Sequence, residues 1–217
     1  MTTTLIPSTK GFTQSDFDVF HIEGLEQRME AIQTHIRPKF LSIGQQLTEE
    51  LSIHDGSEHF LHIAKHARRT VNPPKDTWLA ICNNKRGYKA HPHFQVGLFD
   101  DHLFIWLAFI YELPNKKHIA QTFIDEQDYI FNLIPKDYVI SQDHMQKSAT
   151  SLENLDNDSF AHMLKRFRDV GKAELLIGRH LKPDSNIVKD QASLINFAKE
   201  TYLQLLPLYQ LAFRAIN

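Results

Sequence analysis

Two neighbouring segments are apolar at almost every position, and they constrain the fold more than any other feature. They are HFQVGLF at residues 93–99 and HLFIWLAFIY at residues 102–111, joined by Asp100 and Asp101. Two runs of strand-forming residues with so short a connection predict a β-hairpin, with a primed turn at the aspartates. A half-exposed strand would alternate apolar and polar residues, so both faces of this hairpin must be covered.

The rest of the chain supplies that cover. Pro38 is expected to kink or split the helix predicted at residues 25–51 near Arg37, because proline lacks the amide and crowds the preceding turn. Apolar periodicity predicts helices at residues 15–20, 25–51, 115–131, 156–170 and 189–215, and further strands are predicted at residues 77–82, 138–141 and 173–177. Residues 59–66 also fit one face of a helix, but the extended turn at residues 70–74 favours a strand there.

Consecutive strands with short connections predict the α+β class. We expect a flexible tail at residues 1–10 and a single domain over residues 11–217. In that domain a largely antiparallel sheet of about five to six strands is packed by helices from the N- and C-terminal regions.

Composition bounds the compartment. The only cysteine, Cys82, cannot form an internal disulfide, and the N-terminus lacks the charged start and apolar run of a signal peptide. The longest apolar run, residues 103–111, is far shorter than the roughly 20 residues of a membrane span. We therefore expect a cytoplasmic protein that does not enter a membrane.

Charge is spread unevenly along the chain. Residues 65–93 carry seven Lys and Arg and one acid, whereas the other 188 residues carry 17 basic and 25 acidic side chains. Arginine matches phosphate and carboxylate geometry, and Gly87 permits a positive φ, so this stretch predicts a site for an anionic, phosphorylated ligand. The candidate ligand-binding residues are Lys65, His66, Arg68, Arg69, Lys75, Arg86, Tyr88, Lys89 and His93. The alternative is a solvated face whose cations pair with acids of the terminal helices.

Other functions stay open beside this one. An enzyme could use the same stretch with His66 or His93 as general base and Tyr88 as donor, although no GxSxG or phosphate-loop motif identifies catalytic residues. Nucleic-acid binding is disfavoured because the chain is acidic overall. A protein-interaction module is a further alternative, with the hairpin partly in an interface, and the protein is expected to be a monomer or a homodimer.

Histidine spacing does not indicate a metal. Pairs such as His91 and His93, or His62 and His66, are as frequent as chance supplies among 13 histidines. The HExxH and CxxC patterns of zinc sites are absent from the sequence. We therefore expect no metal and no cofactor.

Four motifs carry a family resemblance. The segments AKHARRTVNPPKDTW, KRGYK, HFQVGLFDDHLFIW and FRDVGKAEL, at residues 64–78, 85–89, 93–106 and 167–175, resemble the YktB-like family of uncharacterised bacterial proteins. The likeness extends over residues 12–213. It implies an intracellular protein of Bacillus-type bacteria with an α+β fold, and it implies no activity and no catalytic residue.

Overall fold

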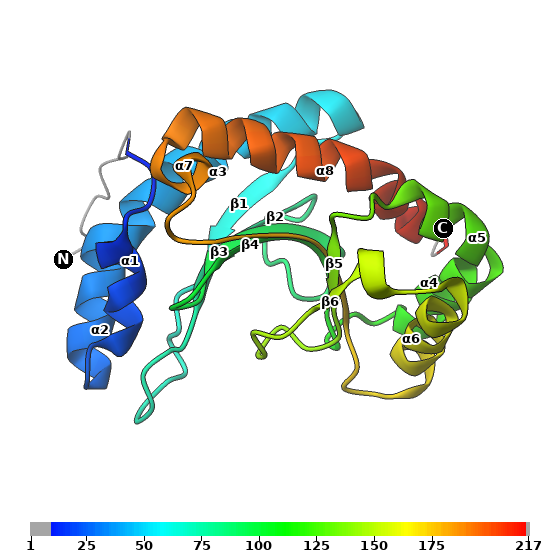
Figure 1. Cartoon of the computed structure of the whole chain (residues 1–217), viewed down its shortest axis with the longest axis horizontal. Helices are drawn as coiled ribbons and strands as arrows, with labels where there is room; N and C mark the ends of the chain where they lie inside the picture. The colour runs from blue at the N-terminus through cyan, green and yellow to red at the C-terminus, as the bar shows by residue number, and fades with distance from the viewer. Residues whose placement is uncertain (1–9, 216–217) are drawn as a thin grey trace.

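The computed structural model describes residues 10–215 and shows an arched sheet with helices above it and at both ends (Figure 1). The predicted tail therefore lies, apart from residue 10, outside the described residues. The strands are β1 (Phe60–Ile63), β2 (Thr77–Cys82), β3 (His93–Leu98), β4 (Leu103–Phe109), β5 (Val139–Ser141), β6 (Thr150–Ser151) and β7 (Leu175–Leu181). The α-helices are α1 (Gln14–Asp18), α2 (Leu25–Ala31), α3 (Arg37–Asp55), α4 (Lys116–Asp125), α5 (Gln127–Leu133), α6 (Asn157–Asp169), α7 (Asn186–Lys189) and α8 (Gln191–Arg214).

All strand pairs of the sheet are antiparallel. Within the described residues the order is β1-β2-β3-β4-β7-β5-β6, so the first four strands form a meander and β7 returns beside β4. The α+β class and the largely antiparallel sheet are confirmed. The sheet has seven strands rather than five to six, because the two-residue β6 is too short to leave a sequence signal.

The β3–β4 hairpin is buried along its whole length, as its composition predicts. Phe94 and Val96 of β3 join the main core beneath the helices, while Gln95 points to the other face. Strand β4 alternates in the same way, with Ile105 in the main core and Trp106 in a second, smaller cluster. The two faces are therefore covered by different parts of the protein.

The predicted primed turn is wrong. Phe99 N donates to His102 O at 2.9 Å and closes the connection. A primed turn needs a positive φ at one or both central residues. Among the described non-glycine residues only His66 has one, so Asp100 and Asp101 form the turn without it.

The predicted kink near Arg37 is confirmed. Residues Ile32–Ile36 form a π-helical segment between α2 and α3, and Pro38 occupies the first turn of α3. A π-bulge before proline lets the helix continue where the missing amide would otherwise break it.

The predicted helix at residues 115–131 is divided into two, whereas the predicted helix at residues 189–215 is confirmed as the single helix α8. Glu126 separates α4 from α5, and Asp190 separates α7 from α8. The Asp190 carboxylate accepts from Ser193 N at 2.8 Å, which makes it the N-cap of α8. Pro207 lies inside α8.

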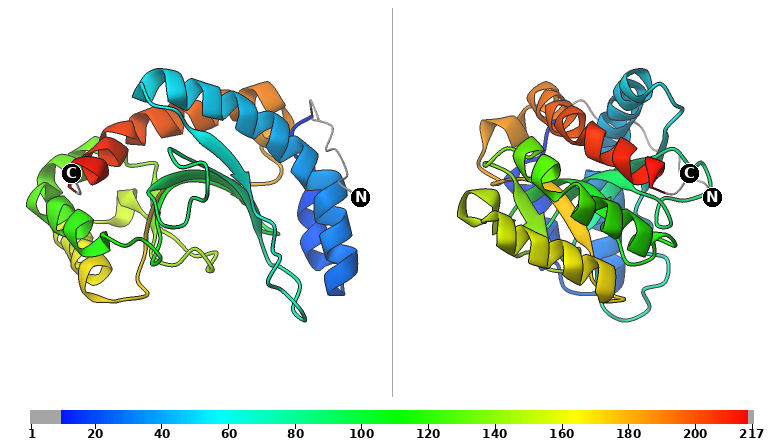
Figure 2. Two further views of the ribbon diagram at one scale, coloured as in Figure 1. Left: turned by 180° about the vertical axis from the view of Figure 1, so that it is seen from behind. Right: turned by 90° about the vertical axis from the view of Figure 1, so that its right-hand side faces the viewer.

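The two faces of the sheet have different covers. Helices α3 and α8 lie along one face, and loops lie below the other (Figure 1 and Figure 2, left). The face turned away from α3 and α8 is called the open face below. None of the described helices is long and apolar enough to cross a bilayer.

A buried lysine fastens α4 to the end of α6. Lys116 is 7% exposed, and its Nζ donates to the carbonyl oxygens of Val170, Gly171 and Ala173 at 2.7, 2.8 and 2.9 Å. Carbonyls at a helix end lack partners within the helix, so one ammonium group satisfies three of them here.

The substitution Lys116→Met should lower the free energy of unfolding by about 1–3 kcal/mol, because it removes the donor of the Gly171 and Ala173 carbonyls, while the Val170 carbonyl keeps its bond from Ala173 N. Urea denaturation followed by circular dichroism measures the change. Lys117→Met is the matched control, since Lys117 is the exposed neighbour on the same helix. Equal losses in the two variants would contradict the capping role.

Candidate functional site

Side chains from four strands form rows across the open face. The register aligns His62, Ala80, Gln95 and Trp106 in one row. The next row runs through Trp78, Gly97, Phe104 and His180. Gly97 is required there, because a Cβ atom at this position would collide with the Phe104 ring. Both rows mix aromatic and polar groups, unlike the aliphatic face under the helices.

Tyr88 connects the loop between β2 and β3 to this face. Its hydroxyl accepts a hydrogen bond from Trp78 Nε1 at 3.1 Å. Its ring lies 4.9 Å from the His93 ring and 5.6 Å from the His62 ring, measured between centroids. Two of the predicted site residues, Tyr88 and His93, are thus in contact.

His93 is locked by its neighbours. Its Nδ1 lies 2.8 Å from His91 O and must donate to it, so Nε2 accepts from Gln95 Nε2 at 2.9 Å. Burial lowers the pKa of His93 to about 3 and keeps the ring neutral. Both ring nitrogens of His93 are therefore used in hydrogen bonds that hold the loop before β3 and the Gln95 side chain. A role of His93 as general base stays a prediction, and this geometry does not favour it.

His66 has an uncommon backbone. Its φ of 52° is left-handed, which costs a non-glycine residue about 1 kcal/mol or more. The conformation places Nε2 3.2 Å from Thr77 Oγ1 and the ring edge-on to Trp78. Burial and then the charges of Arg69 and Arg37 lower the pKa of His66 to about 4, so the ring is neutral at pH 7.

The predicted cations separate into groups. Lys65, Arg86 and Lys89 line a depression of about 810 Å³ beside β1, together with His62, His91, Tyr88, Asn84 and Glu112. We call it the β1 depression. Arg68 and Lys75 are exposed and do not line it.

Arg69 does not line the β1 depression, and it is less exposed than Arg68 and Lys75. Its guanidinium Nη1 lies 3.4 Å from Asn72 O, and its charge lowers the pKa values of His66 and Asp76. Gly87 lines the β1 depression without a positive φ, and a Cβ atom there would meet nothing within 4 Å. Conformational freedom is therefore not the reason for this glycine.

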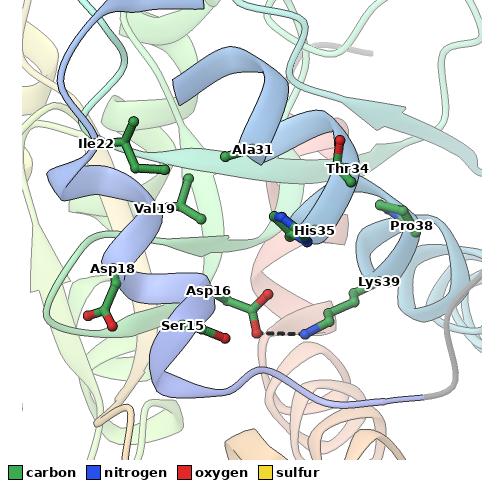
Figure 3. Close-up of a pocket in the computed structure, with 10 residues that line it drawn as sticks. All are labelled: Ser15, Asp16, Asp18, Val19, Ile22, Ala31, Thr34, His35, Pro38 and Lys39. Carbon is green, nitrogen blue, oxygen red and sulfur yellow. Dashed lines mark hydrogen bonds and ion pairs between the residues drawn. The ribbon is translucent and has the colours of Figure 1, made fainter. Parts of the chain in front are cut away.

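A second hollow, of about 490 Å³, lies between α1 and the start of α3. Figure 3 shows that its lysine is already paired, with Lys39 Nζ 2.6 Å from Asp16 Oδ2. Much of the remaining wall is apolar, including Val19 and Ile22. This hollow offers an anion less than the β1 depression does.

A carboxylate–imidazole pair on the open face was missed by sequence reasoning. Glu174 is 1% exposed and accepts from Tyr111 N at 3.2 Å and from both N and Nδ1 of His144 at 2.8 and 2.7 Å. Burial alone would lower the pKa of His144, but the hydrogen bond and charge of Glu174 outweigh it and raise the pKa. Glu174 lies in one of the family motifs, yet nothing in the sequence links it to His144.

Asp76 lies close to this pair. It is 2% exposed, and its Oδ1 has no hydrogen-bond partner among the described residues. Burial raises its pKa to about 6, against the lowering effects of His144 and Arg69. Both His144 and His66 have ring contacts with Trp78, so the cluster surrounds one indole.

The raised pKa of Asp76 fixes the sign of its pH effect. Between the unfolded value of 3.8 and the folded value of about 6, the native state binds more protons than the unfolded state. The carboxylate therefore lowers stability as the pH rises through this window. Above about pH 6 the ionised Asp76 carboxylate lowers the free energy of unfolding by a constant amount.

Accordingly, Asp76→Asn should be more stable than the wild type at pH 7.5, by up to about 3 kcal/mol at 1.36 kcal/mol per pKa unit. The difference should vanish below about pH 4. Urea unfolding of both proteins from pH 4 to 8 measures it. A difference that does not change with pH would show that Asp76 acts through packing alone.

Known proteins resemble this chain over most of its length. Residues 12–209 match the model of a domain of unknown function, DUF1054. UPF0637 proteins of Shouchella clausii and Oceanobacillus iheyensis are each 58% identical, over 205 and 202 residues, which cover 94% and 93% of this chain and 96% of each relative. A UPF0637 protein of Listeria innocua is 48% identical over 205 residues, covering 94% of this chain and 98% of the relative. The resemblance to the YktB-like family of uncharacterised bacterial proteins is thereby confirmed.

Proposed function

We propose that this chain, which belongs to the DUF1054 family of unknown function, binds a small anionic ligand in the β1 depression. The ligand is proposed to carry a phosphate group. The proposal rests on the geometry of the site.

One observation carries the proposal. Three cations that are up to 24 positions apart in sequence, Lys65, Arg86 and Lys89, line one depression of about 810 Å³. Among the described residues that line it, the only acid is Glu112, which pairs with Lys89 at 3.0 Å. The lining therefore keeps an excess of positive charge, and its volume is in the usual range for small-ligand sites.

The depression also offers directional groups. Arg86 presents a planar fork that fits two oxygens of a phosphate or carboxylate. The Tyr88 hydroxyl accepts from Trp78 and so keeps its own proton for a ligand. His62 Nε2 donates to Asn84 O at 2.9 Å, so Nδ1 of the neutral ring can only accept, for example from a protonated oxygen of a ligand.

The proposed ligand set is narrower than the sequence prediction. Of the nine candidates, Lys65, Arg86, Tyr88 and Lys89 line the depression. A ligand role for the other five, His66, Arg68, Arg69, Lys75 and His93, stays a prediction. So do catalysis at the site, nucleic-acid or protein binding, the cytoplasmic location and the choice between monomer and homodimer.

Paired variants test the proposal. In a thermal-shift screen of inorganic phosphate, pyrophosphate, nucleotides and sugar phosphates, a true ligand at a hundred times its Kd should stabilise the protein by about 2.7 kcal/mol. Lys65→Ala/Arg86→Ala should weaken binding of that ligand, measured by calorimetry, roughly tenfold or more, about 1.4 kcal/mol.

The control is Arg68→Ala/Lys75→Ala, which removes the same charge from the same stretch outside the depression. It should bind like the wild type. Equal weakening in both double variants would mean that the net charge, and not the depression, attracts the anion. If no anion stabilises the wild type, the proposal is wrong.

A further inference from the structure

We infer a second site, for a divalent cation, formed by Asp143, His144 and Glu174 on the open face. Each residue offers one ligand atom, and the three atoms all lie within 4.8 Å of one another. Asp143 and His144 follow β5, whereas Glu174 immediately precedes β7. The pairing of Ser141 with Leu176 brings the two segments together.

The triangle has the right size for a metal ion. A point can be placed at most about 2.8 Å (4.8 Å divided by √3) from all three atoms. Zinc binds nitrogen and carboxylate oxygen at about 2.0–2.2 Å, so closing the site needs a movement below about 1 Å. Asp143 is exposed on a loop, and a small shift of its side chain provides that movement.

The carboxylates have little positive charge in direct contact, although Arg69 acts on Asp76 from a distance. Among the described residues no Lys or Arg forms an ion pair with Asp143, Glu174 or Asp76. The nearby Lys116 is occupied by three carbonyl oxygens instead. Among the described residues His144 is the one basic group that contacts Glu174, through the 2.7 Å bond from Nδ1, and binding of the cation releases the proton of that bond.

Asp76 is the independent observation. It is almost fully buried, and its Oδ1 accepts no hydrogen bond from any described residue. Buried carboxylate oxygens are rarely left in this state, so an orphan of this kind needs an explanation. Its neighbour His144 contacts the ring of Trp78, and Asp76 precedes Trp78 by two residues, just before β2 begins. A cation beside His144, or a water bound to that cation, would supply what Oδ1 lacks.

The ligand types define the class of metal. One imidazole nitrogen and two carboxylate oxygens suit Zn²⁺ and, among harder ions, Mn²⁺. The set lacks a thiolate, which soft ions such as Cu⁺ require. Three protein ligands would leave a coordination position for water, as in zinc sites that perform chemistry.

This site shares no residue with the β1 depression, so the two proposals can fail separately. The alternative is a purely structural role, in which Glu174 and His144 hold the loop after β5 through their hydrogen bonds. Metal titration distinguishes the two.

The experiment is calorimetric titration of chelator-treated protein with Zn²⁺ at pH 7.5, repeated with Mn²⁺. Wild type should bind one ion, and Asp143→Asn should weaken binding of that ion roughly tenfold or more, since a ligand is lost. His144→Ala should do the same. The matched controls are Asp184→Asn and His162→Ala, two exposed residues that should bind like the wild type.

Co²⁺ supplies a second readout, because its visible absorption reports ligands and geometry. The band should change in Asp143→Asn and persist in the controls. If His144→Ala fails to fold by circular dichroism, Asp143→Asn decides, since its side chain is exposed. Absence of saturable binding, or equal binding by wild type and Asp143→Asn, would overturn the inference. The latter result would assign the ion to other histidines.

Discussion

The burial of the β3–β4 hairpin on both faces is the constraint on which the rest of the structure depends. The face under α3 and α8 is covered by apolar helix surfaces and needs no polar side chains. The open face is covered by loops, whose backbone groups need hydrogen-bond partners. This requirement explains why histidine, tyrosine and tryptophan lie beside the phenylalanines of this face. His93 bonds the carbonyl of His91, and Tyr88 bonds Trp78.

The two buried carboxylates of the open face differ in how well their oxygens are hydrogen-bonded. Glu174 is buried with three donors around its two oxygens, whereas Asp76 is buried with one oxygen unpartnered. Three histidines, His66, His93 and His180, have pKa values lowered to about 4, 3 and 3 by burial, so they are neutral near pH 7. A native fold tolerates such groups where they hold loops or serve a ligand. Both candidate sites lie at the edges of this arrangement.

Local features of the sequence predicted much of the fold. The segment TWLAIC became β2, and the apolar runs became β3 and β4, because burial on both faces leaves a strong composition signal. Pro38 marked the helix irregularity for an equally local reason. The turn at Asp100 and Asp101 contains no residue that dictates its type, and no proline or glycine in the sequence marks the interruption of the helix at Glu126. For the β1 depression, clustered charge found Lys65, Arg86 and Lys89 but could not show that Arg68 and Lys75 point elsewhere. His144 and Glu174 meet only through the pairing of β5 with β7.

The position of β7 has a consequence for how the chain folds. Strands β1 to β4 pair with their neighbours in sequence, so they can form through short loop closures. Strand β7 pairs with β4 only after residues 110–174, which carry α4, α5 and α6, have been brought back across the sheet. Long loop closures raise contact order and slow folding. We therefore infer that the meander assembles first and that the β4–β7 seam forms late. The part of the open face beside β7, which carries Glu174 and His144, would then be the last part of the molecule to form.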